Sequence, residues 1–148
     1  MTPDSAVQLN ILGYACVVQT GAGKDAGFAD AAYAAVGVEV LPSAEAVFAA
    51  ADVVVKVYAP EIAEAAMLRE GQTLISFFWP AQNLELLDLC RDKGATVIAM
   101  DMVPRIFRAQ KMDALSPMAN IAGYRAVIEA GNHFGRFFCV SACKFNPD

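Results

Sequence analysis

The side chains best suited to chemistry in this sequence lie between Pro104 and Asn120. Five polar residues fall within twelve positions there, without a regular apolar period: Arg105, Arg108, Gln110, Asp113 and Ser116. Arginine and glutamine donate hydrogen bonds to a carbonyl oxygen, whereas aspartate, glutamine and serine accept them from an amide nitrogen. The set therefore suits an amide ligand. The alternative is a solvated loop in which Arg105 pairs with Asp113 and Ser116 caps a helix beginning at Pro117.

Three weaker candidates follow other predicted strands. The glycines Gly21, Gly23 and Gly27 suggest a phosphate site, but their GxGxxxG spacing departs from a dinucleotide fingerprint and equally suits a tight turn. Lys56 lies in the apolar run DVVVKVY, where it is either functional or a strand-end lysine whose ammonium reaches solvent. Trp79 is either a site residue or an aromatic lid over the core.

No residue stands out as a catalytic acid or base, or as a metal ligand. His133 is the only histidine and falls in the last predicted helix, which indicates a helix-face position. The four cysteines form no CxxC pair and no cluster at zinc spacing, so we expect reduced, structural thiols.

Composition restricts the classes of function further. The net charge of -5 and the scattered basic residues argue against a nucleic-acid partner. The mean hydropathy of +0.41 is high, yet no run approaches the roughly 20 apolar residues that a membrane helix needs. The first residues, MTPDSAVQLN, lack the apolar segment of a secretory signal.

Strands and helices are predicted to alternate along the chain. Strands are expected at 14–20, 38–41, 53–58, 73–78 and 95–100, and helices at 3–12, 28–36, 44–51, 60–70, 82–93 and 117–138. Alternation at this spacing predicts an α/β fold with a three-layer, open, mostly parallel sheet of the Rossmann or flavodoxin-like kind, followed by a long C-terminal helix. The near-continuous apolar run at 53–58 predicts a strand buried on both faces.

Several segments together resemble a known family. PRI-x-RAQ, D-x-L-S and MANIAGYRA in the loop and last helix, with TGAGKDAGFAD, VVVKVYAP and LISFFWPAQN before them, are similar to the NAD(H)-binding component of proton-translocating NAD(P) transhydrogenase. The similarity is to the N-terminal part of that component, the alanine dehydrogenase/transhydrogenase N-terminal domain family. It covers about residues 3 to 138.

The resemblance implies a transfer of hydride between NAD(H) and NADP(H) in which no protein group acts as an acid or base. Arg105 and Asp113, with Ser116, would hold the NAD(H) carboxamide, and Gln110 would reach toward NADP(H) on a partner component. Further possible cofactor contacts are Lys56, Trp79 and Arg108. Alanine dehydrogenase, the relative of this family, carries a histidine where this chain has Trp79.

The resemblance also predicts the limits of the chain. Residues 1–138 would be the N-terminal lobe, with 117–138 as the helix between lobes, and the tail 139–148 does not resemble the family. The NAD-binding Rossmann lobe, with its glycine fingerprint, is absent from this sequence, and the family's first strand would precede Thr2. We therefore expect the chain alone to be inactive and not to bind NAD(H) tightly.

The expected partners are those of the parent enzyme. They are a second copy of the NAD(H)-binding component, the NADP(H)-binding component and the membrane component, with no membrane span in this chain. The expected location is the cytoplasmic face of a bacterial inner membrane or the matrix side of the mitochondrial one. Two other functions stay open: a noncatalytic interaction module that pairs with a full-length subunit, and an alanine dehydrogenase-like oxidoreductase.

Overall fold

The computed structural model of the chain describes residues 1–135. The chain divides into two compact units, Met1–Val103 and Pro104–Asp148. The predicted tail 139–148, which includes Cys139 and Cys143, lies outside the described residues.

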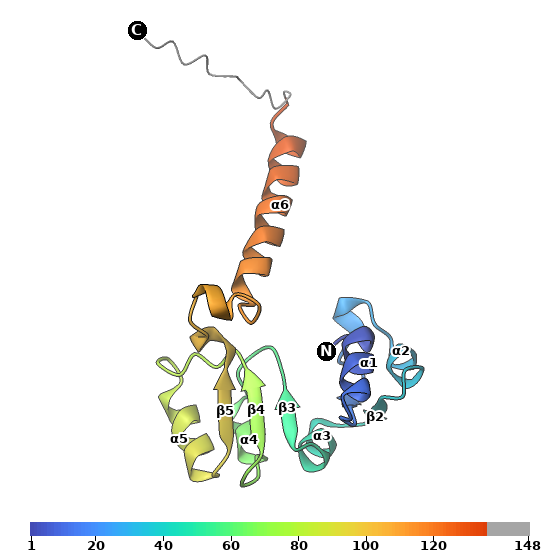
Figure 1. The fold of residues 1–148 in the computed structure, drawn as a ribbon, viewed down its shortest axis with the longest axis vertical. Coiled ribbons are helices and arrows are strands. Elements are labelled where there is room, and N and C mark those ends of the chain that lie inside the picture. Colours follow the sequence, from blue (N-terminus) through green and yellow to red (C-terminus); the bar gives the residue numbers. More distant parts are fainter. Residues whose placement is uncertain (136–148) are drawn as a thin grey trace. The chain divides into compact units, whose positions relative to one another are not determined.

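Helices and strands alternate through the first unit, as the sequence predicts (Figure 1). The helices are α1 (Pro3–Ile11), α2 (Asp30–Ala34), α3 (Ala44–Ala50), α4 (Ile62–Ala66) and α5 (Leu84–Asp92), with short 3-10 turns at Lys24–Ala26 and Met100–Met102. The strands are β1 (Val17–Gln19), β2 (Glu39–Leu41), β3 (Val53–Val55), β4 (Thr73–Ser76) and β5 (Thr96–Ala99).

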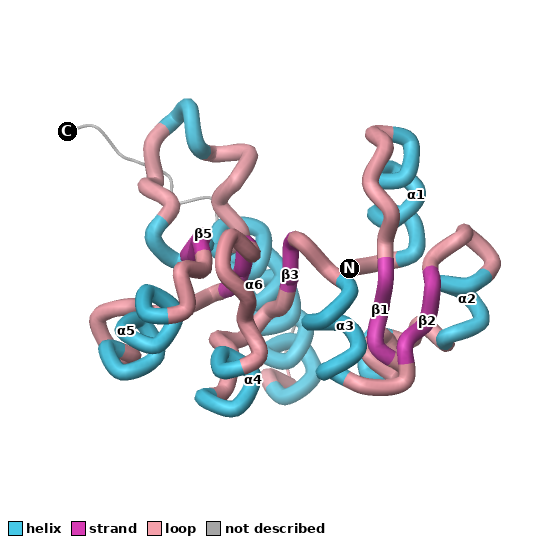
Figure 2. The backbone as a smooth tube through the Cα atoms, turned by 90° about the horizontal axis from the view of Figure 1, so that it is seen from below, coloured by secondary structure: helices cyan, strands magenta, loops and turns pink. Residues whose placement is uncertain are grey.

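All pairings among these strands are parallel, which confirms the predicted fold class. β1 pairs with β2, with Val18 opposite Val40. A second sheet has the order β3-β4-β5, with Leu74 of β4 between Val54 of β3 and Val97 of β5. The parallel strands are thus divided between two sheets, which Figure 2 shows from below.

Each sheet has its own hydrophobic core. The larger core joins the β3-β4-β5 sheet to α3, α4 and α5, and its buried members are Phe48, Val54, Ala65, Leu68, Leu74, Phe78, Leu86 and Cys90. The smaller core joins the β1-β2 sheet to α1 and α2 through Ala6, Tyr33 and Val38. Burying apolar surface stabilises the fold by about 25 cal/mol per Å². The two cores therefore hold the ends of the strands in fixed positions.

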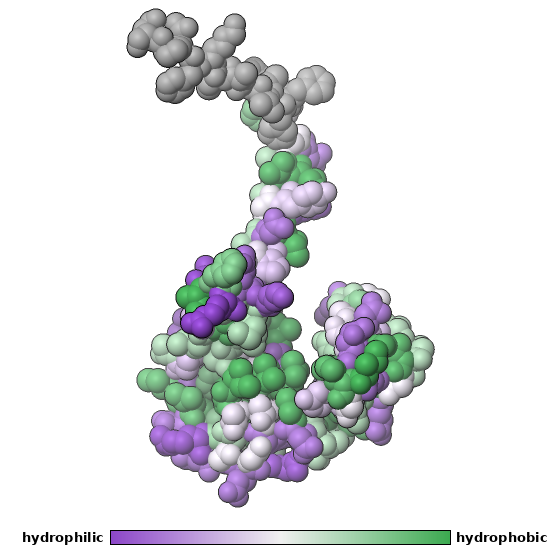
Figure 3. Space-filling view, viewed as in Figure 1, coloured by the Kyte–Doolittle hydropathy of each residue, from purple (hydrophilic) through white to green (hydrophobic). Residues whose placement is uncertain are grey.

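The prediction that the strand at 53–58 is buried on both faces is wrong. Val54 is buried, but Val53 is 47% exposed and Val55 is 65% exposed. Val55 stands in register with Ile75 and Ile98 along the same face. Figure 3 shows hydrophobic side chains gathered over this part of the unit. The physical reason is that the larger core packs only against the face that carries Val54.

Local signals explain why α1 and α3 begin at the predicted residues, Pro3 and Ala44. Thr2 caps α1, its side-chain oxygen accepting from the Ser5 N–H at 3.2 Å, and Pro3 takes the first helical position. Ser43 caps α3 in the same way, accepting from the Ala46 N–H at 3.3 Å.

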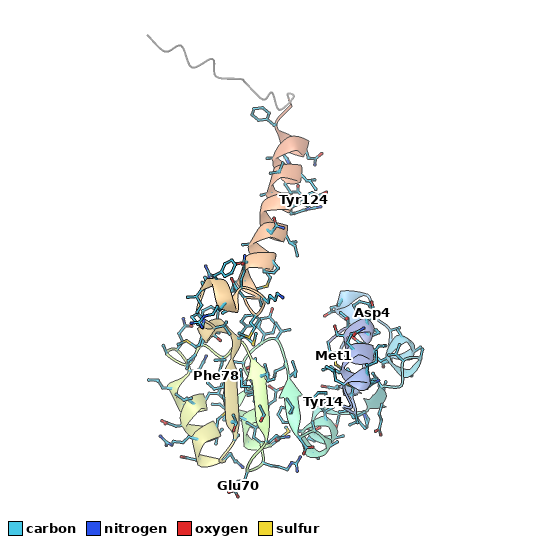
Figure 4. The ribbon with its side chains drawn as sticks, in the orientation of Figure 1. Met1, Asp4, Tyr14, Glu70, Phe78 and Tyr124 are labelled. Atoms are coloured by element: carbon cyan, nitrogen blue, oxygen red, sulfur yellow. The ribbon has the colours of Figure 1, made fainter. Side chains whose placement is uncertain are left out.

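The second unit contains a 3-10 turn at Phe107–Ala109 and the long helix α6 (Leu115–His133). The predicted helix 117–138 exists, but it begins two residues earlier than expected. Its end is marked by Gly135, at φ 62, and positions 136–138 lie outside the described residues. Tyr124 projects from α6 and is 72% exposed (Figure 4). Within residues 1–135, no helix has both the length and the apolar character to cross a membrane.

Candidate functional site

The five polar residues of the candidate loop all lie in the second unit. Arg105 follows Pro104, Arg108 lies within the 3-10 turn, and Gln110 is the residue that ends that turn. Asp113 precedes α6, and Ser116 lies in the first turn of that helix. The loop is therefore tied to the N-terminal end of α6.

Asp113 organises the helix end of the loop. One carboxylate oxygen accepts from the Leu115 N–H at 2.9 Å, and the other accepts from the Ser116 hydroxyl. The first N–H groups of a helix have no partner inside it, so this bond satisfies one of them. The pKa of Asp113 is lowered, chiefly by the Ser116 hydroxyl, then by the Leu115 N–H, with a further contribution from the charge of Arg105.

These contacts correct two parts of the solvated-loop alternative. Ser116 does not cap a helix that begins at Pro117, because it already lies inside α6 and donates back to Asp113. Pro117 is tolerated there because its missing N–H belongs to the group that a helix start leaves unpaired. Among residues 1–135, Arg105 and Asp113 form no ion pair, although the positive charge of Arg105 contributes to the lowered pKa of Asp113.

The lowered pKa of Asp113 gives a testable pH dependence. A carboxyl with a lower pKa in the folded state stabilises that state above its unfolded pKa and ceases to do so as pH falls through its folded pKa. We expect the amide proton shift of Leu115, followed by NMR, to titrate with a midpoint below the usual aspartate value of about 3.9. Asp113→Asn is the control and should abolish the titration. A midpoint at or above the usual value would contradict the hydrogen-bonding scheme.

Two more residues of the candidate set share an open surface depression. Arg108 and Gln110 line it together with Phe107 and Lys111. Phe107 is 92% exposed, and its ring is the apolar part of a lining that is otherwise polar. The loop thus presents a carboxylate and a hydroxyl at the start of α6, and a guanidinium and an amide in this depression.

The glycine segment of the first unit forms a tight turn. Gly21 has φ 74 and Gly27 has φ 80, conformations that glycine adopts without strain. The Asp30 carboxylate accepts from the Gly21 N–H at 2.8 Å and from the Thr20 hydroxyl at 2.5 Å. A negative carboxylate therefore occupies the N–H that a phosphate would need, and these hydrogen bonds lower the pKa of Asp30. The turn alternative is supported, and the phosphate alternative is not.

Lys56 is held by an ion pair in the first unit. Its ammonium donates to the Glu64 carboxylate of α4, and about a quarter of each side chain is exposed. Burial raises the pKa of Glu64, but hydrogen bonds from Lys56 and from the Glu61 N–H lower it by more. The side chain is neither a free cation at the strand end nor a solvated one, because Glu64 balances its charge.

Trp79 follows β4 in a conformation that is unusual for a residue with a side chain. Its φ is 51. Trp79 is 46% exposed whereas Phe78 is fully buried, so Phe78 and not Trp79 is the aromatic residue that covers the core. The Asp101 carboxylate holds this turn by accepting from the Phe78 N–H at 2.6 Å and the Trp79 N–H at 3.1 Å. Asn83 donates from its side chain to the Phe78 and Trp79 carbonyls.

Asp101 is the residue that the sequence reasoning missed. It lies in the 3-10 turn Met100–Met102 that follows β5, and the turn that it clamps follows β4, the neighbour of β5 in the sheet. The carboxyl ends of parallel strands share one edge of the sheet. The available signal was therefore an acidic residue just after the predicted strand 95–100, at the same edge as the residues that follow the predicted strand 73–78.

The described residues offer no group of three or more histidine, cysteine, aspartate and glutamate side chains placed to hold a metal ion. Cys90 is buried in the larger core, and burial raises the pKa of its thiol. His133 lies at the end of α6, 77% exposed at its side chain, with Nδ1 2.9 Å from the Glu129 carbonyl oxygen.

The fold and the loop define a class: a parallel α/β unit whose last strand is followed in sequence by a polar loop and a long helix. The chain belongs to the alanine dehydrogenase/PNT N-terminal domain family, whose model matches residues 1–122.

Relatives in this family agree along most of the chain. NAD(P) transhydrogenase subunit alpha of Cereibacter sphaeroides is 78% identical over 138 residues, 93% of this chain and 26% of that protein. The Haemophilus influenzae subunit of the same name is 47% identical over 137 residues, again 93% of this chain and 26% of the relative. Alanine dehydrogenase of Mycobacterium tuberculosis is 33% identical over 136 residues, 92% of this chain and 36% of that enzyme.

The fold also agrees with solved structures. The crystal structure of transhydrogenase from Sinorhizobium meliloti matches with a TM-score of 0.82 and 38% identity, over 91% of this chain and 40% of that chain. An L-alanine dehydrogenase structure matches with a TM-score of 0.66 and 34% identity, over 70% of this chain and 28% of that chain. The chain spans about a quarter of the transhydrogenase alpha subunits that it resembles.

Proposed function

We propose that this chain supplies the nicotinamide-contacting loop of a transhydrogenase that passes hydride between NAD(H) and NADP(H). The observation that carries the proposal is the hydrogen bonding of Asp113 and Ser116 at the start of α6. The carboxylate of Asp113 accepts from the Leu115 N–H through one oxygen and from the Ser116 hydroxyl through the other, while a carboxylate has about four acceptor positions. Acceptor capacity therefore remains on Asp113 and on the Ser116 oxygen for the NH₂ group of a carboxamide.

The other half of a carboxamide needs donors. The guanidinium of Arg105 is close enough to lower the pKa of Asp113 and would donate to the carboxamide oxygen. Fixing both ends of the carboxamide sets the rotation of the ring, and with it the face that exchanges hydride. Gln110 would reach toward NADP(H) on the partner component, and Arg108, Lys56 and Trp79 remain possible further contacts.

The proposed role does not require the chain to hold a whole dinucleotide. The one glycine turn that resembles a phosphate cradle has its Gly21 N–H bonded to the negative Asp30 carboxylate. The adenosine and phosphate portions would be held by a Rossmann lobe elsewhere in the parent enzyme. This chain alone would then be inactive in hydride transfer.

The proposed partners follow from that division. They are a second NAD(H)-binding component, the NADP(H)-binding component and the proton-translocating membrane component, to which this chain would be peripheral. The proposed location is the cytoplasmic face of a bacterial inner membrane, or the matrix side in mitochondria.

Titration with nicotinamide mononucleotide, followed by amide NMR shifts, tests the role of the loop. We expect weak binding that moves the signals of Gln110, Leu115 and Ser116. Loss of a hydrogen bond from a charged group costs about 1.5–3 kcal/mol, so Arg105→Ala should weaken binding by about tenfold or more. Arg91→Ala, which removes an exposed arginine of α5, is the matched control and should have no effect. Shifts at Gly21 and Gly27 instead would contradict the proposal.

A further inference from the structure

Within residues 1–135, one residue that carries a side chain adopts the left-handed backbone conformation, and it is Trp79, at φ 51. The other residues there with a positive φ are glycines. A bulky side chain is disfavoured in this region because its Cβ approaches the following carbonyl oxygen, whereas glycine enters the region freely. The turn after β4 would therefore form more easily with glycine, and its backbone gives no reason for an indole.

Two side chains hold the backbone of this turn. The Asp101 carboxylate accepts from the Phe78 N–H at 2.6 Å and from the Trp79 N–H at 3.1 Å. The Asn83 amide donates to the carbonyls of the same two residues, at 2.9 and 3.2 Å. The Trp79 carbonyl also accepts from the Gln82 N–H at 2.9 Å. A disfavoured conformation persists only where its surroundings over-determine it, and these contacts do so.

The hydrophobic core does not account for the indole either. Phe78 is fully buried in the larger core, whereas the neighbouring Trp79 is 46% exposed. Within residues 1–135, Trp79 takes part in no aromatic ring pair. Almost half of the indole is therefore accessible to a ligand, in a turn that is held rigidly around it.

The turn lies at an edge of the sheet where ligands bind. It follows β4, the middle strand of the β3-β4-β5 sheet (Figure 1). In open parallel sheets, ligands bind beyond the carboxyl ends of the strands. Asp101 stands three residues before Pro104 in the sequence. The loop of the proposed function therefore leaves the first unit just after the residue that holds the Trp79 turn.

The exposed indole suits a planar, cationic ring. The face of an indole is apolar and carries the negative part of the ring quadrupole, so it attracts flat rings and also cations. The oxidised nicotinamide ring is a pyridinium cation, whereas the reduced ring is neutral and no longer aromatic. An indole face can therefore distinguish the two oxidation states of this ligand.

We propose that Trp79 is a stacking surface for the oxidised nicotinamide ring, and that Asp101 is the positioning residue that holds Trp79 in the left-handed conformation. The inference rests on the proposed function, which supplies the ligand, and it adds a contact and a preference for the oxidised state. Asp101 bonds to the backbone of Trp79, so its effect on binding passes through the indole.

Tryptophan fluorescence tests the contact, because Trp79 is the only tryptophan in the chain. Contact with an oxidised nicotinamide ring quenches an excited indole. Oxidised nicotinamide mononucleotide should therefore quench Trp79 saturably, with the same dissociation constant as the amide shift of Leu115 in the NMR titration with this ligand. By that shift, the oxidised form should bind about threefold or more tightly than the reduced form, as expected of a cation–π contact.

Two variants separate positioning from stability. Trp79→Gly keeps the turn, since glycine adopts this φ freely, so the chain should stay folded, bind the oxidised ligand about threefold or more weakly, and lose the preference between oxidation states. Asp101→Asn should weaken binding to a similar extent. In the Trp79→Gly background it should weaken binding no further, because no indole remains to be positioned. Asp88→Asn, which changes an exposed carboxylate of α5, is the matched control and should leave binding unchanged.

The outcomes distinguish this inference from the proposed function. A Leu115 shift without quenching of Trp79 overturns the inference and leaves the proposed function intact. Quenching without a Leu115 shift supports the indole contact and contradicts the proposed role of the loop. Equal binding of the two oxidation states overturns the stacking on a cation. An Asp101→Asn effect that is the same with and without the indole would make Asp101 structural only and overturns its positioning role.

Discussion

Replacing Phe78 by alanine should lower the free energy of unfolding by about 3–5 kcal/mol, the usual cost of removing a buried phenylalanine side chain. Phe78 is fully buried in the larger core, where it packs with residues of β4 and α5 (Figure 4). Its N–H also donates to Asp101, so the residue joins the core to the turn that carries Trp79. Since small domains have only about 5–15 kcal/mol of stability, this loss is a large share of it.

Phe107→Ala is the matched control for that prediction. The same side chain is removed, but from a position that is 92% exposed. We expect its effect to be within about 0.5 kcal/mol. Urea unfolding followed by circular dichroism measures both variants, and equal losses of stability would contradict the burial of Phe78.

Replacing Gly23 by alanine should also destabilise the first unit, for lack of space and not for lack of conformational freedom. Gly23 has φ -93, which any residue can adopt. A Cβ there would lie 2.6 Å from the Tyr33 hydroxyl oxygen and 2.8 Å from the Phe28 carbonyl oxygen. Tyr33 is 1% exposed, and its hydroxyl donates to the Met1 carbonyl, so the ring has no room to withdraw. Overpacking of this kind costs about 1–3 kcal/mol.

Gly123→Ala provides a control of opposite sign. Gly123 lies inside α6, and a Cβ added there meets nothing within 4 Å. Alanine in a helix interior is favoured over glycine by about 0.5–1 kcal/mol, so this variant should gain helical stability. Thermal unfolding of the two variants measures both effects. If Gly23→Ala and Gly123→Ala shifted the Tm in the same direction, the result would contradict this account.

The features that the sequence predicted correctly are those with local causes. The predicted start of a helix at residue 3 needs no knowledge of the rest of the chain, because the Thr2 cap and Pro3 at the first helical position act on neighbouring residues. The alternation of strands and helices is equally local in origin, and it was sufficient to predict the parallel α/β class.

The features that the sequence did not predict depend on distant partners. The burial of β3 depends on which helices cover each face, and its apolar run carries no such information. The clamp of Asp101 on Trp79 joins residues 22 positions apart, across neighbouring strand ends. The start of α6 was predicted two residues too late. The Asp113 carboxylate accepts from the Leu115 N–H, so the helix begins at Leu115 and not at Pro117.

The candidate loop was found from residue types, and its amide-binding interpretation became specific only with the family resemblance. The structure adds the hydrogen bonds of Asp113 to Leu115 and Ser116, and it removes the glycine turn as a phosphate site through Asp30. In the proposed function, the chain contacts the nicotinamide through this loop, and within residues 1–135 the glycine turn is occupied by Asp30 and is not the phosphate site.

Isothermal titration of this chain with NADH, and separately with reduced nicotinamide mononucleotide, tests that description most directly. If the chain contacts only the nicotinamide half, the two ligands should bind with similar dissociation constants of about 1 mM or weaker, near -4 kcal/mol. An NADH dissociation constant of about 1 μM, near -8 kcal/mol, would mean that the rest of the dinucleotide is also held and would contradict the account.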